Sequence, residues 1–466
     1  MLKRNWMVAA MLLAIAGSVH AQGAELTKIR AEIEQMRRAY EQRIGALEKR
    51  LAEAETKAGR AEKNAANAEA AAVSTTGQGG ENAFNPAISL VLQGTYARTS
   101  QDPDSYRITG FTPSGGEVGP PKRSFGLGET ELAIGANIDP YFRGVAIASL
   151  APDGGASVEE AYFQTLALPV GFTAKGGRFF SGLGYLNEQH QHAWDFQDAP
   201  LPYKAFLGKQ LRQDGLQLKW IAPTELLIEL GAEFASGDQF PGSDRNKNGT
   251  GGSSIFGHVG GDIGASYAWR TGLSYLKASP RDRSYTDSDA LGNPVVNSFT
   301  GRANLWVADA VLKWAPEGNA TRTSFKLQGE YFRLNQNGRL NYDDSAGSGV
   351  FGSVSDTYVS RQSGWYLQGV YQFQPRWRVG YRHDRLHFGT VSNGLVLNGA
   401  GPVAADFPLL TPYSPSRNTL MVDWNPTEFS RIRLQLAQDK SRLGATDNQI
   451  FLQYIYSLGA HGAHKF

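Results

Sequence analysis

From residue 86 onward, this chain repeats short runs in which apolar and polar side chains alternate one by one. A period of two places every second side chain on the same face of an extended strand, so each run predicts a strand with one apolar and one polar face. The last run is rich in aromatic residues, and one of its two faces consists of Ile450, Leu452, Tyr454, Tyr456 and Leu458. The alternation therefore predicts an all-β domain over residues 86–466.

Sixteen runs follow this pattern, and the connections between them alternate between short ones and mostly long ones. This asymmetry is typical of an outer-membrane barrel with short periplasmic turns and long outside loops, and an even strand number puts both barrel ends in the periplasm. A soluble β-sandwich, the alternative, leaves the loop lengths unexplained. We predict a 16-stranded antiparallel transmembrane β-barrel with strands near 87–98, 125–138, 141–150, 156–167, 171–179, 213–221, 225–237, 255–263, 267–278, 302–314, 321–334, 363–373, 376–388, 416–425, 429–441 and 447–458, and with long loops at 99–124, 180–212, 238–254, 279–301, 335–362 and 389–415.

Charged residues decide which face of each strand looks into the barrel, because a charge at the lipid midplane costs about 2–4 kcal/mol. In the run 225–237, Glu229 and Glu233 share one face, which we assign to the lumen. In the run 429–441, the lumenal face carries Arg431, Arg433 and Gln435. The opposite faces, with leucine, isoleucine and phenylalanine, are assigned to lipid.

Composition excludes several classes of protein. The chain has no cysteine, so it has no disulfide framework and no thiolate metal site or nucleophile. No segment after the first residues approaches the 18 consecutive apolar residues of a membrane helix. The 46 basic residues are matched by 44 acidic ones, so the charge gives no support for a nucleic-acid partner.

The N-terminus predicts export. Lys3 and Arg4 precede a short apolar core, and Val19-His20-Ala21 is a small-residue cleavage site, so residues 1–21 are predicted to be a cleaved signal peptide. The alternative, an uncleaved anchor, requires a longer apolar core.

Residues 24–72 predict a helix with apolar residues at spacings of three and four, which is a coiled-coil seam. Two four-residue steps in succession at Met36, Tyr40 and Ile44 form a stutter, and beyond Leu51 the seam is only alanine. We predict a periplasmic coil that forms a homotrimer. The alternative is a charged monomeric spacer. Residues 73–85 predict a flexible linker.

The region 85–466 resembles a known family of proteins. The aromatic last strand and the terminal Phe466 resemble the C-terminal signal that outer-membrane barrels present to the barrel-assembly machinery. With sixteen strands and a long third outside loop, the region 85–466 resembles the phosphate-selective porin O and P family, and the segment Phe172–Tyr185 (FTAKGGRFFSGLGY) is similar to that family's strand entering the third loop. The resemblance implies an outer-membrane porin.

A second stretch, 186–195 with 203–208, is similar to outer-membrane proteins sometimes labelled TonB-dependent or zinc-regulated receptors. Such receptors carry a plug domain and about 22 strands. This chain has a predicted coil in place of the plug and room for about sixteen strands.

The predicted lumenal charges segregate along the chain. The early wall is acidic and the later wall is basic, which would set up a transverse field that favours polar solutes. The alternative is a soluble lining in which neighbouring charges neutralise one another. Because acids match bases, the lining does not favour phosphate specificity. The predicted pore-lining and constriction residues are Lys175, Lys204, Arg212, Glu229, Glu233, Lys326, Arg378, Arg382, Arg431 and Arg433.

Loop 180–212 is unusually apolar for a surface loop, so we predict that it folds into the pore or packs on the wall as the constriction. His190 and His192, together with Glu188 and Asp195, have the residue types of a Zn²⁺ site. The alternative is that both histidines only form hydrogen bonds within a packed constriction.

The predicted function is passive diffusion of small hydrophilic solutes or ions through an outer-membrane porin, with no cofactor. The alternatives are a substrate-specific or metal-binding uptake channel and an adhesin or tether built on the coil. An enzyme is not predicted: His383, His387 and Asp384 lie close in sequence, but a triad is defined by geometry.

Overall fold

The computed structural model describes residues 34, 37, 38, 86–115, 118–150, 154–246 and 248–459. The chain divides into two compact units, Met1–Asn85 and Pro86–Phe466. In the first unit only Glu34, Arg37 and Arg38 are described, and all three are helical. The predicted signal peptide, nearly all of the predicted coil, the linker and Phe466 lie outside the described residues and stay predictions. No helix in the described part of the chain is long and apolar enough to cross a bilayer.

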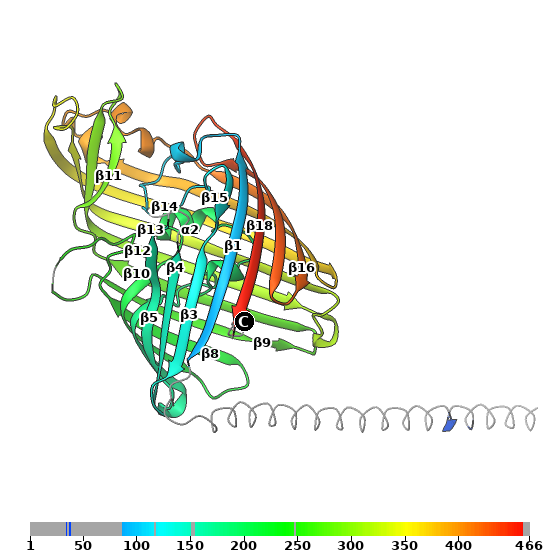
Figure 1. The fold of residues 1–466 in the computed structure, drawn as a ribbon. Coiled ribbons are helices and arrows are strands. Elements are labelled where there is room, and N and C mark those ends of the chain that lie inside the picture. The colour runs from blue at the N-terminus through cyan, green and yellow to red at the C-terminus, as the bar shows by residue number, and fades with distance from the viewer. Residues whose placement is uncertain are drawn as a thin grey trace, which may run out of the picture. The chain divides into compact units, whose positions relative to one another are not determined.

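The second unit is a closed antiparallel β-barrel (Figure 1). Its strands form one sheet, and β1 pairs with β18, so the sheet closes on itself. Segments β2 and β3 both pair with β1, and β10 and β11 both pair with β12, so the wall has the 16 strand positions that the alternation predicted. The segments are β1 (Ala87–Thr99), β2 (Ser124–Leu127), β3 (Thr130–Asn137), β4 (Phe142–Leu150), β5 (Ala156–Thr165), β6 (Phe172–Phe180), β7 (Arg212–Ile221), β8 (Leu227–Ala235), β9 (Gly252–Ile263), β10 (Tyr267–Ala278), β11 (Arg283–Ser288), β12 (Pro294–Trp314), β13 (Ser324–Asp343), β14 (Ser353–Gln374), β15 (Trp377–Asn393), β16 (Ser416–Thr427), β17 (Ser430–Lys440) and β18 (Asp447–Gly459).

The connections contain short helices. The α-helices are α2 (Leu201–Leu207) and α3 (Gly394–Leu397), and the 3-10 helices are η1 (Pro103–Ser105), η2 (Pro169–Gly171), η3 (Gln191–Ala193), η4 (Pro316–Gly318), η5 (Ala404–Asp406) and η6 (Pro408–Leu410).

The strands β12 to β15 are longer than predicted. They continue well past the predicted runs, so much of 279–301 and 335–362, predicted as loops, is paired strand. Most outward side chains in these extensions are polar, for example Thr300, Asn337 and Arg339, so the apolar alternation fades there. Backbone pairing does not need an apolar face, which is why the strands outlast the pattern that predicts them.

The predicted faces of the strands are confirmed. Leu230 and Leu434 point outward with 51% and 44% exposure, whereas Glu233 and Arg433 point inward with 0% and 1% exposure. The barrel thus has an exposed apolar outer face and a charged inner face. One part of the interior was not predicted: Leu305, Val307, Phe332, Leu334 and Leu386 also point inward and form an apolar core with residues of the connections.

A charge placed on the outer face tests this assignment. Leu434→Arg is expected to lower the free energy of unfolding from lipid vesicles by about 2–4 kcal/mol, because the outward position then buries a guanidinium in lipid. The control is Gln438→Arg, which is outward on the same strand beyond the apolar positions and is expected to change the value by less than about 1 kcal/mol. Equal effects of both changes in urea titrations would contradict the assigned apolar band.

Candidate functional site

Residues 181–211 connect β6 to β7 and lie inside the barrel; we call them the inner loop. Leu183, Trp194 and Tyr203 of this loop are almost completely buried. Its helix α2 packs against β13, β14 and β15, as Figure 1 shows. The helix is short because Pro202 lies in its first turn and Gly208, with φ of 62°, ends it in a left-handed conformation.

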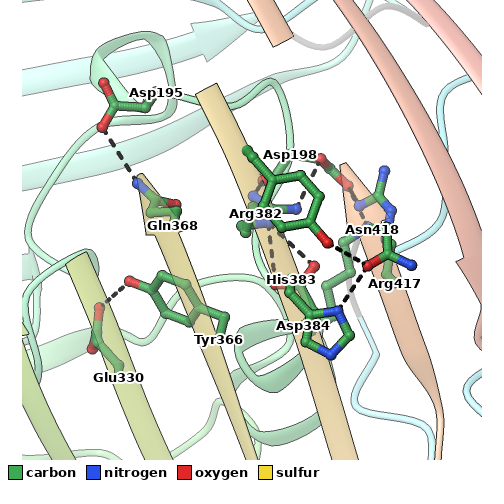
Figure 2. Close-up of polar contacts among 12 residues, drawn as sticks. Asp195, Asp198, Glu330, Tyr366, Gln368, Arg382, His383, Asp384, Arg417 and Asn418 are labelled. Atoms are coloured by element: carbon green, nitrogen blue, oxygen red, sulfur yellow. Dashed lines mark hydrogen bonds and ion pairs between the residues drawn. The ribbon is translucent and has the colours of Figure 1, made fainter. Parts of the chain in front are cut away.

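Two wall glutamates hold the backbone where the inner loop begins. Glu330 of β13 accepts hydrogen bonds from the backbone N–H groups of Tyr185 and Leu186 at 3.2 and 3.0 Å. The hydroxyl of Tyr203 also donates to Glu330, at 2.9 Å, as does that of Tyr366, which is visible in Figure 2. A Cβ at Gly184 would lie 2.4 Å from the Glu330 carboxylate, so only glycine fits there. Glu233 of β8 accepts from the loop in the same way.

Asp195 binds the inner loop to the basic wall. Its carboxylate lies 2.6 Å from Lys326 Nζ and 3.2 Å from Arg378 Nη1, and it also accepts from Gln368 (Figure 2). Burial raises the pKa of Asp195, but Lys326 and Arg378 outweigh it and lower this pKa to about 2. The carboxylate is therefore a stable anion between two cations.

Asp198, three residues further on, makes a second set of contacts. It faces Arg382 of β15 at 3.3 Å and Arg417 of β16 (Figure 2). Lys204 of α2 lies 2.9 Å from the same carboxylate. Burial raises the pKa of Asp198, but Arg417, Lys204 and Arg382 together hold it well below its ordinary value. The side chains of Arg382 and Arg417 are 1% exposed and that of Asp198 is 22% exposed, so solvent and salt screen these pairs only in part.

On the acidic side of the barrel, the inner loop presents His190. Its Nδ1 lies 3.3 Å from carboxylate oxygens of both Glu131 and Glu159, and its Nε2 lies 3.0 Å from Glu160. Burial lowers the pKa of His190, but hydrogen bonds with the three carboxylates raise it well above its ordinary value. His192 Nδ1 lies 2.9 Å from the other oxygen of Glu131.

A β-bulge explains why Glu159 and Glu160 both point inward. In the pairing of β4 with β5, Ile147 faces Glu160 and Ala148 faces Val158, so Glu159 is an extra residue. An unbroken strand would send adjacent side chains to opposite faces. The extra residue turns a second carboxylate to the lumen.

A cavity of about 1060 Å³ lies in the lumen beside the inner loop. Residues of short connections line it, such as Gly264, Ser266 and Gly318, so it occupies the short-turn end of the barrel. Of the predicted lining residues, it takes in Lys175, Lys326 and Arg378, and it also takes in His190 and His192, which were predicted as metal ligands.

The other predicted lining residues lie outside the cavity, and most of them contact either the inner loop or other side chains of the wall. Arg431 donates to the carbonyl of His192 and Arg433 to that of Trp194, while Glu229 pairs with Lys219 and His258 within the wall. Lys204, Glu233 and Arg382 make the contacts given above. Arg212 is the first residue of β7, is half-buried and is not among the cavity-lining residues.

Sequence reasoning missed Arg417 and Glu159 as site residues. The alternation of the predicted strand 416–425 gives Arg417 the same face as Thr419, opposite the outward Leu420, so this residue could have been found. The inward orientation of Glu159 has no signal in the sequence, because it depends on the bulge.

The predicted partners of the two histidines were wrong in part. The rings of His190 and His192 stack with centroids 5.7 Å apart, as their shared loop suggests. However, Asp195 binds Lys326 and Arg378, and Glu188 lies 3.8 Å from Lys219. The carboxylates beside His190 come from the wall strands β3 and β5 instead.

The residues considered for a triad are separated by the strand alternation. Asp384 pairs with Arg382 at 3.1 Å inside the barrel, whereas His383 Nδ1 lies 2.8 Å from Asn418 Oδ1 (Figure 2). Adjacent residues of one strand point to opposite faces, so His383 and Asp384 do not meet.

The fold and this site define a closed β-barrel with a connection folded into its lumen. A protein from Aquifex aeolicus (strain VF5), described as uncharacterized, is 32% identical over 416 residues, which cover 83% of this chain and 81% of that protein. The chain belongs to the same family as this Aquifex protein. No family model matches the chain.

Solved outer-membrane proteins are similar at a lower level. A loop L8 deletion mutant of OmpT from Vibrio cholerae has a TM-score of 0.49 and 10% identity and covers 80% of this chain and 99% of its own. The channel DcaP of Acinetobacter baumannii has a TM-score of 0.45 with 11% identity and covers 80% and 97%. OprB of Pseudomonas putida has a TM-score of 0.44 with 15% identity and covers 80% and 94%. At these values the likeness carries no assignment of function.

Removing the Asp198 carboxylate tests the role of its ion pairs. Asp198→Asn leaves the buried Arg382 and Arg417 with only their wall partners Asp384 and Asp439, at 3.1 and 3.5 Å, and we expect a loss of about 3 kcal/mol in the free energy of unfolding and faster proteolysis of the inner loop. The control, Asp238→Asn, changes an exposed loop carboxylate and should have no such effect. Wild-type stability and protection in Asp198→Asn would contradict the assigned role.

Acid should break the ion pairs of Asp195 with Lys326 and Arg378 only at low pH. Because the folded pKa of Asp195 lies below its ordinary value of 3.8, its ion pairs stabilise the fold above about pH 4, and this contribution is lost as the pH falls toward 2. Thermal denaturation in detergent is expected to show a fall in Tm over this range that is smaller in Asp195→Asn. The same pH dependence in both proteins would contradict the assignment.

Proposed function

We propose that the protein is an outer-membrane porin for passive diffusion of small hydrophilic solutes or ions, with the inner loop as its constriction. The observation that carries the proposal is a closed barrel with an exposed apolar outer face and a charged inner face around a cavity of about 1060 Å³. An apolar outer face is stable in contact with lipid chains, and a polar interior is stable in contact with water.

The two ends of the barrel support an orientation. One end carries short connections such as 264–266 and 375–376, and the other carries the extended pairs of β12 to β15. Short periplasmic turns and long outside segments are the rule for outer-membrane barrels, so the cavity is proposed to open toward the periplasm. The homotrimer, the periplasmic coil and recognition by the barrel-assembly machinery remain proposals from the sequence.

The charged side chains that line the cavity favour neither anionic nor cationic solutes. Cationic and anionic side chains line it in nearly equal numbers, and some of them pair with each other, as Lys326 does with Asp195. A phosphate-selective pore needs an uncompensated run of basic groups. The proposed selectivity between anions and cations is therefore weak. The lining residues are Arg143, Lys175, Arg270, Lys313, Lys326 and Arg378, with Glu131, Glu160, Glu188, Asp195 and Asp262.

One observation favours a second candidate, a substrate-specific uptake channel. The inner loop is bound to walls on both sides of the lumen, to Glu160 of β5 and Glu233 of β8 as well as to Arg382 of β15. Such a loop could keep the channel closed until a solute binds. A diffusion porin conducts steadily without ligand, whereas the second candidate is closed at rest.

Conductance in planar bilayers tests the proposal. The folded full-length mature protein is expected to give steady single-channel currents with a reversal potential near zero in a salt gradient. The double change Asp195→Asn with Asp198→Asn should increase the conductance or its noise, because it loosens the constriction, and Asp238→Asn should not. Correctly folded barrels without current in the absence of ligand would reject the open porin and favour the second candidate.

A further inference from the structure

We infer that the barrel carries a divalent transition-metal site in its lumen, formed by His190, Glu131 and Glu159 and oriented by Glu160. This inference goes beyond the proposed porin function and does not depend on it, because metal binding can be measured without conduction.

The ligand atoms have the right types and positions. Glu131, Glu159 and His190 each offer one atom, and the three atoms lie within 4.8 Å of one another. Metal–ligand distances of about 2.0–2.2 Å place neighbouring ligand atoms of a tetrahedral Zn²⁺ about 3.3–3.5 Å apart. His190 Nδ1 lies 3.3 Å from oxygens of both Glu131 and Glu159. An ion can therefore replace the proton between these atoms with little movement.

The surrounding groups have the arrangement that metal-binding histidines require. The second ring nitrogen of such a histidine usually donates to a carboxylate, which fixes the ring and its tautomer. His190 Nε2 lies 3.0 Å from Glu160, and the backbone N–H of Phe180 donates to the other Glu160 oxygen at 3.1 Å. His192 lies 2.9 Å from the second oxygen of Glu131 and orients this ligand in the same manner.

Burial and backbone geometry set this cluster apart from an ordinary set of surface acids. Glu131, Glu159 and Glu160 are all less than 9% exposed, and three neighbouring buried carboxylates repel one another. The bulge in β5 brings Glu159 to this face although an unbroken strand would turn it outward. A divalent cation bound between Glu131 and Glu159 would reduce this repulsion.

The donor set selects the class of metal. An imidazole nitrogen with carboxylate oxygens suits zinc and neighbouring first-row ions, whereas Ca²⁺ and Mg²⁺ prefer six or more oxygen ligands. Glu131 and His190 line the lumenal cavity, so an ion reaches the site from there. Three protein ligands leave a coordination position for His192, water or a solute group.

The test is zinc binding by the full mature chain, purified without a polyhistidine tag and dialysed against Zn²⁺ before metal analysis. We expect about one tightly held Zn²⁺ per chain, undisturbed by excess Ca²⁺. Glu160→Gln should weaken binding about 10- to 100-fold, and His190→Gln or Glu159→Gln should abolish it at the same concentration. The control, Glu188→Gln, changes a carboxylate of the same cavity outside the cluster and should bind zinc like the wild type.

Folding of each variant is checked by the heat-dependent shift of the barrel in electrophoresis. X-ray absorption on the wild-type zinc complex adds a measurement that needs no variant, and it should show imidazole nitrogen together with carboxylate oxygen at about 2.0 Å. Absence of stoichiometric zinc in the wild type would overturn the inference. The C-terminal tail offers two other histidines, His461 and His464. Zinc that persists in His190→Gln and is lost when these two histidines are replaced would also overturn the inference.

Discussion

The position of the inner loop depends on the buried ion pairs between its aspartates and the basic wall. Asp195 and Asp198 are surrounded by Lys326, Arg378, Arg382 and Arg417, and burial of these groups is tolerated only because each charge has a partner. Without the loop, the wall would present guanidinium groups that its own carboxylates Asp384, Asp423 and Asp439 compensate only in part. Without the wall, the loop would carry two carboxylates into an apolar core. The two therefore require each other.

The ion pairs between the inner loop and the wall change how the segregation of lumenal charges along the chain is interpreted. The basic later wall and the acidic early wall do face the lumen, but a large part of their charge is used to hold the inner loop: aspartates on one side, His190 on the other. A transverse field across open water is thus reduced where the loop lies. In the proposed porin, what remains for solutes is the cavity at the short-turn end, whose lining has nearly equal numbers of cationic and anionic side chains.

The sequence was sufficient for the wall and insufficient for the interior. Period-two alternation predicts strand number and faces because lipid and water impose it at every strand, and Leu434 and Arg433 obey it. It fails inside the barrel, where Leu305 and Phe332 point inward against the loop and where a bulge turns Glu159 to the lumen. It also fades beyond the apolar band, where outward side chains such as Asn337 and Arg339 are polar. The partners of His190 could not be predicted, because they come from strands whose spatial neighbours the sequence does not name.

Cysteine modification during single-channel recording tests the central claim that solutes pass the inner loop, and the chain has no native cysteine to interfere. Gln189 belongs to the inner loop and lines the cavity. A charged methanethiosulfonate reagent should reduce the current of Gln189→Cys in discrete steps and leave that of the outward-facing Gln438→Cys unchanged. A conducting Gln189→Cys channel whose modification is verified by mass but whose current does not change would contradict a conduction path past this loop.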